Sequence, residues 1–284
     1  MMLFYTRSAE HLARKLDVSL GKQTIRKFKD GELYVMIEEA GLKGKIAWVI
    51  AALNPPAENL LELFFILDAL KRAHARIKLV VTYFGYARQD RIVPGEAFTS
   101  RLICNWLSVY GIERIEVIHM HSSRLSRYLD YHNYVPVGFF LRHISKGDVL
   151  AAPDKGALPL ARILSKKSGT PYVHLQKRRT GPDIISMKGL TGDVKGKDVV
   201  IVDDMISTGS TIIEASKLLK AAGARRISAV ATHGIFAKGC EEKIDASPIS
   251  KVYVTNTIFQ RRRSHKIIVL DISPYIRKIM GRET

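Results

Sequence analysis

The chain has 284 residues, 46% of them apolar, and its longest apolar stretches fall far short of the roughly 20 residues that a membrane-spanning helix needs. Lys and Arg outnumber Asp and Glu by 45 to 27, which gives a net charge of +18 at pH 7. The basic residues are spread along the chain without interleaved aromatic residues, so we expect anionic small molecules as partners, and neither nucleic acid nor a membrane.

The cysteines and the first residues of the chain indicate in which cellular compartment the protein is expected. Cys104 and Cys240 are the only cysteines, and they lack the spacing of a metal site or a redox motif. The chain opens on a strand-like segment, MLFYT, without the pattern of a signal peptide. We therefore expect a protein of the reducing cytoplasm.

Strand-like runs alternate with helical periodicity along the chain, which predicts an α/β fold with parallel sheets. In a first domain, residues 1–144, we expect strands near Leu3 and over 46–51, 78–84 and 115–118, with helices over 8–16, 58–72 and 100–110. In a second domain, residues 145–272, we expect strands over 149–152, 172–174, 198–202, 227–232 and 251–255, with helices over 157–166 and 209–222. The C-terminal segment 273–284 should be helical over 273–280 and pack on the first domain.

The segment 199–211, VVIVDDMISTGST, joins a buried strand to a helix through paired acids and a hydroxyl-rich turn. Asp203 and Asp204 follow the apolar run, at the strand end where open α/β sheets place their ligands. Gly209 lets the backbone approach an anion, and the N–H groups that begin a helix suit a phosphomonoester. Further donors would be the hydroxyls of Ser207, Thr208, Ser210 and Thr211. A plain turn and helix cap would use the same residue types, but the paired acids favour a phosphate site.

This segment resembles the loop that binds phosphoribosyl diphosphate (PRPP) in type I phosphoribosyltransferases and in ribose-phosphate diphosphokinases, the enzymes that make PRPP. Other segments choose the diphosphokinases, and the chain as a whole resembles archaeal-like members of that family. YFGYARQDR, 83–91, resembles their signature, and FKDGE, 28–32, is similar to their adenine-binding loop, which reaches into a neighbouring subunit. QKRRTG, 176–181, is similar to the start of their mobile catalytic loop, and PDKG, 153–156, to their ribose-phosphate and metal segment.

The resemblance implies a specific fold, reaction and site. It implies two similar domains of the type I phosphoribosyltransferase fold, each a mostly parallel sheet flanked by helices, in an enzyme that is at least a homodimer. The reaction moves the diphosphate of MgATP to the 1-hydroxyl of ribose 5-phosphate, giving PRPP and AMP, with Mg²⁺ as cofactor. The implied residues are Lys177 and Arg179 for catalysis; Phe28, Asp30, Glu32, Arg88, Gln89, Asp90 and His121 for ATP; Asp203, Asp204, Ser207, Thr208, Gly209, Ser210 and Thr211 for ribose 5-phosphate; and His121 and Asp154 for the metal.

The chain departs from the family pattern after the strand 115–118. His121 stands where the family carries a His that contacts metal and phosphate, but His119 and Ser122 replace its usual Asp and Ala. Because alternate residues of a strand share a face, we expect His119 near His121. Two other functions stay open: a phosphoribosyltransferase that consumes PRPP, and a non-catalytic regulatory relative.

Overall fold

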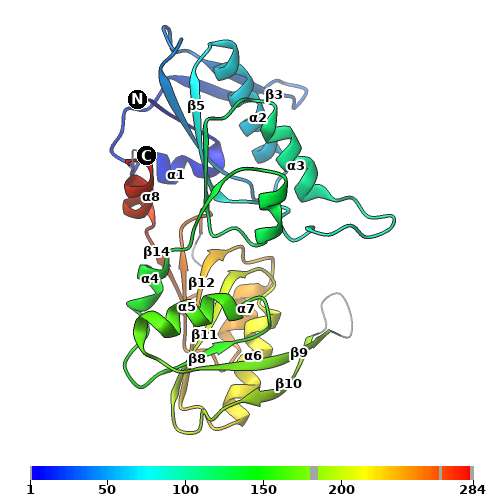
Figure 1. The fold of residues 1–284 in the computed structure, drawn as a ribbon, viewed down its shortest axis with the longest axis vertical. Helices are drawn as coiled ribbons and strands as arrows, with labels where there is room; N and C mark the ends of the chain where they lie inside the picture. Colours follow the sequence, from blue (N-terminus) through cyan, green and yellow to red (C-terminus); the bar gives the residue numbers. More distant parts are fainter. Residues whose placement is uncertain (1, 180–184, 262–263, 282–284) are drawn as a thin grey trace. The chain divides into compact units, whose positions relative to one another are not determined.

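The computed structural model describes residues 2–179, 185–261 and 264–281, except for the side chains of residues 177–179 and 185–188. The chain forms two compact units, each with its own α/β fold (Figure 1). Unit 1 consists of Met1–Val135, Thr257–Phe259 and Ile272–Thr284, and unit 2 consists of Pro136–Asn256 and Gln260–Asp271. Unit 2 begins before residue 145, where the sequence pattern placed the division, because α4 (Val137–Leu141) packs against α5 (Leu158–Ser168) of that unit.

Unit 1 is built on a five-stranded parallel sheet in the order β1-β4-β5-β6-β7. Its central strands are apolar along their length, as strands buried on both faces must be. The strands are β1 (Met2–Tyr5), β4 (Ile46–Ala52), β5 (Arg76–Tyr83), β6 (Arg114–Ile118) and β7 (His132–Tyr134). The helices are η1 (Arg7–Ala9), α1 (Glu10–Ala13), α2 (Glu58–Arg72), α3 (Thr99–Ser108), η2 (Ser123–Arg127) and α8 (Ser273–Met280). The C-terminal helix α8 is tied into this unit, since the Tyr275 hydroxyl donates to the Val135 carbonyl over 3.2 Å.

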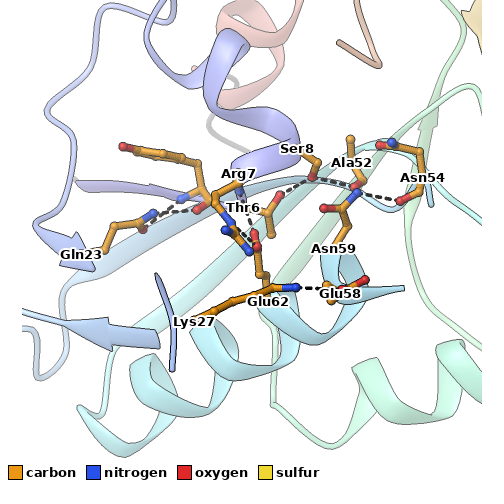
Figure 2. A network of polar contacts seen from close by, with 11 residues as sticks. Thr6, Arg7, Ser8, Gln23, Lys27, Ala52, Asn54, Glu58, Asn59 and Glu62 are labelled. Carbon is orange, nitrogen blue, oxygen red and sulfur yellow. Dashed lines mark hydrogen bonds and ion pairs between the residues drawn. The ribbon is translucent and has the colours of Figure 1, made fainter. Parts of the chain in front are cut away.

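A separate antiparallel hairpin of β2 (Gln23–Lys27) and β3 (Leu33–Ile37) belongs to the same unit. Figure 2 shows the polar contacts that anchor it to β1 and α2. Gln23 exchanges two hydrogen bonds with the backbone of Tyr5, and Lys27 pairs with Glu58 over 3.0 Å. Beside them, the buried carboxylate of Glu62 accepts hydrogen bonds from the backbone and the guanidinium of Arg7. The base of the hairpin is therefore fixed on the unit.

Unit 2 is built on a seven-stranded sheet in the order β10-β9-β8-β11-β12-β13-β14, in which only the β9–β10 pair is antiparallel. The strands are β8 (Val149–Ala152), β9 (Tyr172–Arg179), β10 (Ile185–Thr191), β11 (Asp198–Ile206), β12 (Arg226–Gly234), β13 (Lys251–Thr255) and β14 (Ile267–Leu270). Besides α4 and α5, the helices are α6 (Ser210–Ala221) and α7 (Cys240–Asp245). The predicted α/β class with mostly parallel sheets is confirmed.

The expected elements differ from the observed ones mainly in short segments and at strand ends. The strands expected over 172–174 and 198–202 continue to Arg179 and Ile206 respectively. The hairpin β2–β3, the strands β7, β10 and β14, and the helices α4 and α7 were not expected. Within the described residues, every helix is too short or too polar to cross a bilayer.

Candidate functional site

The paired acids lie within β11 and not beyond its end. Asp203 stands opposite Ala231 in the parallel ladder with β12, and the ladder continues to Ile206. The expectation that the strand stops at residue 202 was wrong, because backbone pairing with the long strand β12 continues whatever the side chains are. Both acids are half-buried, and only Met205 and Ile206 separate them from the turn to α6.

Three carboxylates influence one another near this strand end. Asp154 follows β8, the strand that pairs with β11, and its Oδ1 accepts the N–H groups of Gly156 and Ala157 over 2.9 and 3.2 Å. Burial, followed by the negative charges of Asp204 and Asp154, raises the pKa of Asp203 well above its usual range. Asp203 also accepts the N–H of Asp204 over 2.9 Å. A cation bound nearby would offset the mutual repulsion of these carboxylates.

The donor set suits Mg²⁺ in its usual protein setting. Mg²⁺ prefers oxygen ligands and is commonly held by one or two carboxylates, with waters and substrate phosphates completing its shell. Among the described residues no group of three or more His, Cys, Asp or Glu side chains is arranged to hold a metal. Asp154 and the neighbouring acids are therefore suited to a site in which one or two carboxylates bind the Mg²⁺, and waters and substrate phosphates complete its shell. His121 belongs to unit 1 and Asp154 to unit 2, so their pairing as ligands stays a prediction.

The turn from β11 to α6 has the features of an anion loop. Gly209 has φ +78°, and a Cβ placed there would lie 2.9 Å from the Cys240 sulfur, so only glycine fits without a shift. The plain-turn interpretation requires a Ser or Thr hydroxyl that caps α6. The N-cap residue is instead Gly209, which has no side chain, so none of the described hydroxyls nearby serves as that cap. The hydroxyl oxygens of Thr208 and Ser210 lie 3.1 Å apart. Ser207 is held in place where its carbonyl accepts the N–H of Ala237 over 3.0 Å.

Lys177 and Arg179 lie in the last residues of β9, where β10 pairs with them in antiparallel register. Their backbone is therefore part of a hairpin, whereas the resemblance implied the start of a mobile loop. Their side chains, and residues 180–184 that connect the two strands, lie outside the described part of the chain. The catalytic roles of both residues stay predictions.

The predicted adenine loop is the tip of the β2–β3 hairpin. Phe28 donates its N–H to the Glu32 carbonyl over 2.8 Å, and the Asp30 carboxylate accepts the N–H of Glu32 over 3.0 Å. Asp30 thus shapes the turn. Phe28 is 42% exposed and lies edge-on to Tyr34, with the Arg26 guanidinium over both rings. An exposed, braced aromatic ring is suited to stack on a nucleobase.

The signature segment 83–91 turns back on itself directly after β5. A Cβ at Gly85 would lie 1.8 Å from the Leu53 carbonyl oxygen, so this position tolerates no side chain. Arg88 and Gln89 are exposed. Asp90, in contrast, is held internally, because it accepts hydrogen bonds from the Ser122 hydroxyl over 2.7 Å and from Arg124 over 3.2 Å.

Sequence reasoning missed this connection between Asp90 and Ser122, the residue that replaces the family's alanine. A cavity of about 280 Å³ adjoins it, and three arginines, Arg91, Arg124 and Arg127, contribute to its lining. Guanidinium groups gathered around a small cavity attract anions. The sequence signal was the cluster of basic residues over 124–127, which was not connected with the signature segment.

The two histidines after β6 do not share a strand face. β6 ends at Ile118, and His119 has φ +47° with its N–H donated to the Tyr134 carbonyl over 3.0 Å. The expectation that alternation brings His119 near His121 therefore lacks its basis, because the chain has left the extended conformation. His121 is exposed.

Comparison with known proteins identifies the family. Residues 2–111 match the N-terminal domain of ribose phosphate pyrophosphokinase, and residues 166–283 match the phosphoribosyl synthetase-associated domain. The ribose-phosphate pyrophosphokinase of Helicobacter hepaticus is 35% identical over 98% of this chain and 93% of its own length, and that of Thermotoga maritima is 34% identical over 96% and 90%. The crystal structure of phosphoribosylpyrophosphate synthetase from Mycobacterium smegmatis superposes with a TM-score of 0.89 at 30% identity and covers 98% of this chain and 97% of its own. The chain belongs to the ribose-phosphate pyrophosphokinase family.

Proposed function

We propose that this protein is an enzyme that transfers the diphosphate of MgATP to the 1-hydroxyl of ribose 5-phosphate, giving PRPP and AMP. The observation that supports this most is the set of carboxylates beside the Gly209 turn, in a chain that matches its family almost end to end. We also propose that the enzyme is cytoplasmic and at least a homodimer, since the assigned adenine site draws on two subunits.

The sugar side of the site lies in unit 2. The turn over 207–211 would hold the 5-phosphate through backbone N–H groups and hydroxyls. Asp203 and Asp204 would accept hydrogen bonds from the ribose 2- and 3-hydroxyls, since both are half-buried at the edge of this turn. These contacts would orient the 1-hydroxyl for attack.

The nucleotide side draws on unit 1. The exposed Arg88 and Gln89 would bind the α-phosphate region of ATP, with Asp90 and its partner Ser122 fixing the segment. Phe28 of a neighbouring subunit would stack on the adenine, while the rest of its loop, Asp30 and Glu32, keeps the turn in shape.

Transfer is an in-line displacement. The sugar oxygen loses its proton to solvent and forms a bond to the β-phosphorus, while the bond from that phosphorus to the α,β-bridging oxygen breaks and AMP leaves with the bridging oxygen. Mg²⁺ held by Asp154 and His121 would neutralise phosphate charge when bound. Lys177 and Arg179 would contact the diphosphate as its charge shifts, so their contribution is electrostatic and greatest in the transition state.

The test is product analysis by chromatography with ATP, ribose 5-phosphate and Mg²⁺. AMP and PRPP formed in equal amounts support the proposal. Consumption of PRPP with a free base, without AMP release, would instead identify a phosphoribosyltransferase, and neither reaction would indicate a non-catalytic relative.

The catalytic pair is tested by Lys177→Ala and Arg179→Ala, with Lys166→Ala on the exposed face of α5 as the matched control. Each of the first two should lower kcat by about 10² or more with a smaller change in KM, as for contacts made in the transition state. The control should match the wild type. A rise in KM alone would reject the assignment.

A further inference from the structure

The segment 88–90, which the proposed function assigns to ATP, is held by a buried serine of α3 (Figure 1). The Ser100 hydroxyl, in the first turn of this helix, donates to the Gln89 carbonyl over 2.6 Å. Ser100 is 0% exposed, whereas Arg88 and Gln89 are exposed. A buried anchor therefore holds an exposed segment by its backbone and leaves the side chains of Arg88 and Gln89 at the surface.

The next residue, Asp90, is fixed from a second element of unit 1. Its Oδ2 accepts hydrogen bonds from the Ser122 hydroxyl over 2.7 Å and from the Arg124 guanidinium over 3.2 Å. Ser122 is buried and is also the N-cap of η2, where its hydroxyl accepts the N–H of Arg124 over 3.3 Å. The two serines thus hold neighbouring residues of one segment, from α3 and from η2, and these two elements pack against each other.

The backbone directly before this segment needs such support. Tyr86 has φ +62°, a conformation that residues other than glycine rarely adopt. Strained residues of this kind persist only where the surrounding structure holds them in place. Gln89 donates its N–H to the Tyr86 carbonyl over 3.0 Å. Gln89 therefore connects the strained turn, through its N–H, to Ser100, through its carbonyl.

The same bond closes the base of an exposed loop. Residues 91–97 are exposed, and they lead from the segment 88–90 to the start of α3. The far end of this loop is tied as well, because Phe98 lies edge-on to Tyr128 with 5.5 Å between ring centroids, and the Arg101 guanidinium lies 5.1 Å from the centre of the Tyr128 ring. Without the Ser100 hydroxyl, the segment 88–90 would become continuous with the exposed loop.

We propose that Ser100 is a positioning residue for ATP, an inference that rests on the proposed function. By fixing the Gln89 carbonyl, it orders the backbone that carries Arg88 and Gln89 before the nucleotide binds. Ordering the segment then costs little of the binding energy, as in other preorganised sites. A residue with this role sets the affinity for ATP. It has little effect on the chemical step, or on the sugar side of the site in unit 2.

Steady-state kinetics of Ser100→Ala test this role. The KM for ATP should rise about tenfold, because the Gln89 carbonyl loses its buried donor, while kcat and the KM for ribose 5-phosphate stay close to the wild-type values. Two controls remove a serine hydroxyl that donates to a carbonyl of its own helix over 2.7 Å: Ser216→Ala, buried in α6, and Ser108→Ala, at the end of α3. Both should keep the wild-type KM for ATP, and melting curves check that each variant is folded.

Hydrogen exchange followed by mass spectrometry gives a second readout, one that does not depend on activity. The backbone amides of residues 88–91 should exchange faster in Ser100→Ala than in the wild type, because the anchor that limits local opening is gone. In both control variants these amides should exchange at the wild-type rate.

An unchanged KM for ATP in Ser100→Ala would overturn the proposal, even if the segment exchanged faster. A rise in this KM without faster exchange would also overturn it, as would an equal rise in the KM for ribose 5-phosphate, which would indicate general damage. A wild type that forms no AMP would instead reject the proposed function. In that case, faster exchange in Ser100→Ala would still support the anchoring role of this serine, and unchanged exchange would refute it.

Discussion

Replacing Asp203 by Asn should stabilise the unliganded protein while it weakens the binding of ribose 5-phosphate. The pKa of Asp203 is raised by burial and by the charges of Asp204 and Asp154, so ionising this carboxyl costs more in the folded than in the unfolded state. Stability is therefore lost as pH rises from the unfolded pKa, about 3.9, through the higher folded pKa. Asn does not ionise and can still accept the N–H of Asp204, so the variant escapes this loss.

The expected gain in stability follows from the removal of a buried negative charge that two neighbouring carboxylates repel. Substitutions of this class commonly add about 0.5–2 kcal/mol to the free energy of unfolding, at a cost in function. For a unit of this size each kcal/mol corresponds to about 2–4 °C, so we expect a rise in Tm of about 1–8 °C at pH 7.5. The difference between variant and wild type should shrink as the pH is lowered through the folded pKa to below about 4, because Asp203 then becomes protonated in both states.

Scanning calorimetry of both proteins from below pH 4 up to pH 7.5 tests this, with and without ribose 5-phosphate. The sugar phosphate should raise the Tm of the wild type more than that of the variant, because ligand stabilisation depends on affinity. Calorimetric titration should show ATP binding largely unchanged. A variant less stable than the wild type at pH 7.5, or a Tm difference that is constant with pH, would refute the electrostatic reasoning.

Two further substitutions test structural details. Gly85→Ala should lower Tm in melting curves and raise the KM for ATP at least tenfold in steady-state assays, because its Cβ would overlap the Leu53 carbonyl and displace Arg88 and Gln89. Gly138→Ala is the control and should have neither effect, because nothing lies within 4 Å of the added Cβ. Lys266→Met should lower the free energy of unfolding in urea by about 1–3 kcal/mol, because the ammonium group donates to the carbonyls of Ile244, Asp245 and Ser247 at the end of α7. Lys243→Met, on the exposed side of that helix, is the control and should leave this free energy unchanged. An equal loss in both lysine variants would contradict the capping role.

Strong apolar periodicity made much of the fold predictable. The helix α2 and the strand β13 have the predicted bounds, because runs of buried apolar residues define them. The hairpin β2–β3 escaped notice because its strands are only half-buried and carry charged residues such as Arg26. β10 escaped because its sequence, ISMKGLT, is short and interrupted by a glycine, and its pairing with β9 is not visible in that sequence.

The site was predictable where its chemistry is local in sequence. Asp203, Asp204 and Gly209 stand within a few residues of one another, and their types alone indicate a phosphate site. The contacts that support them are not local. Ser122 reaches Asp90 across 32 positions of the chain, and Cys240 packs against Gly209 from another helix, so only the folded chain reveals either contact.

The packing of Cys240 beneath the Gly209 turn makes this thiol a chemical reporter. Cys240 is 1% exposed, and burial raises its pKa to about 12, so the thiolate fraction is on the order of 10⁻⁴ at pH 8. Cys104, the other cysteine, is also buried, with its pKa raised to about 11. Alkylation of the native protein by iodoacetamide should therefore be slow at both positions. Labelling of Cys240 would record each opening of the turn over 207–211, and occupancy of that turn by a phosphate ester should slow the labelling further.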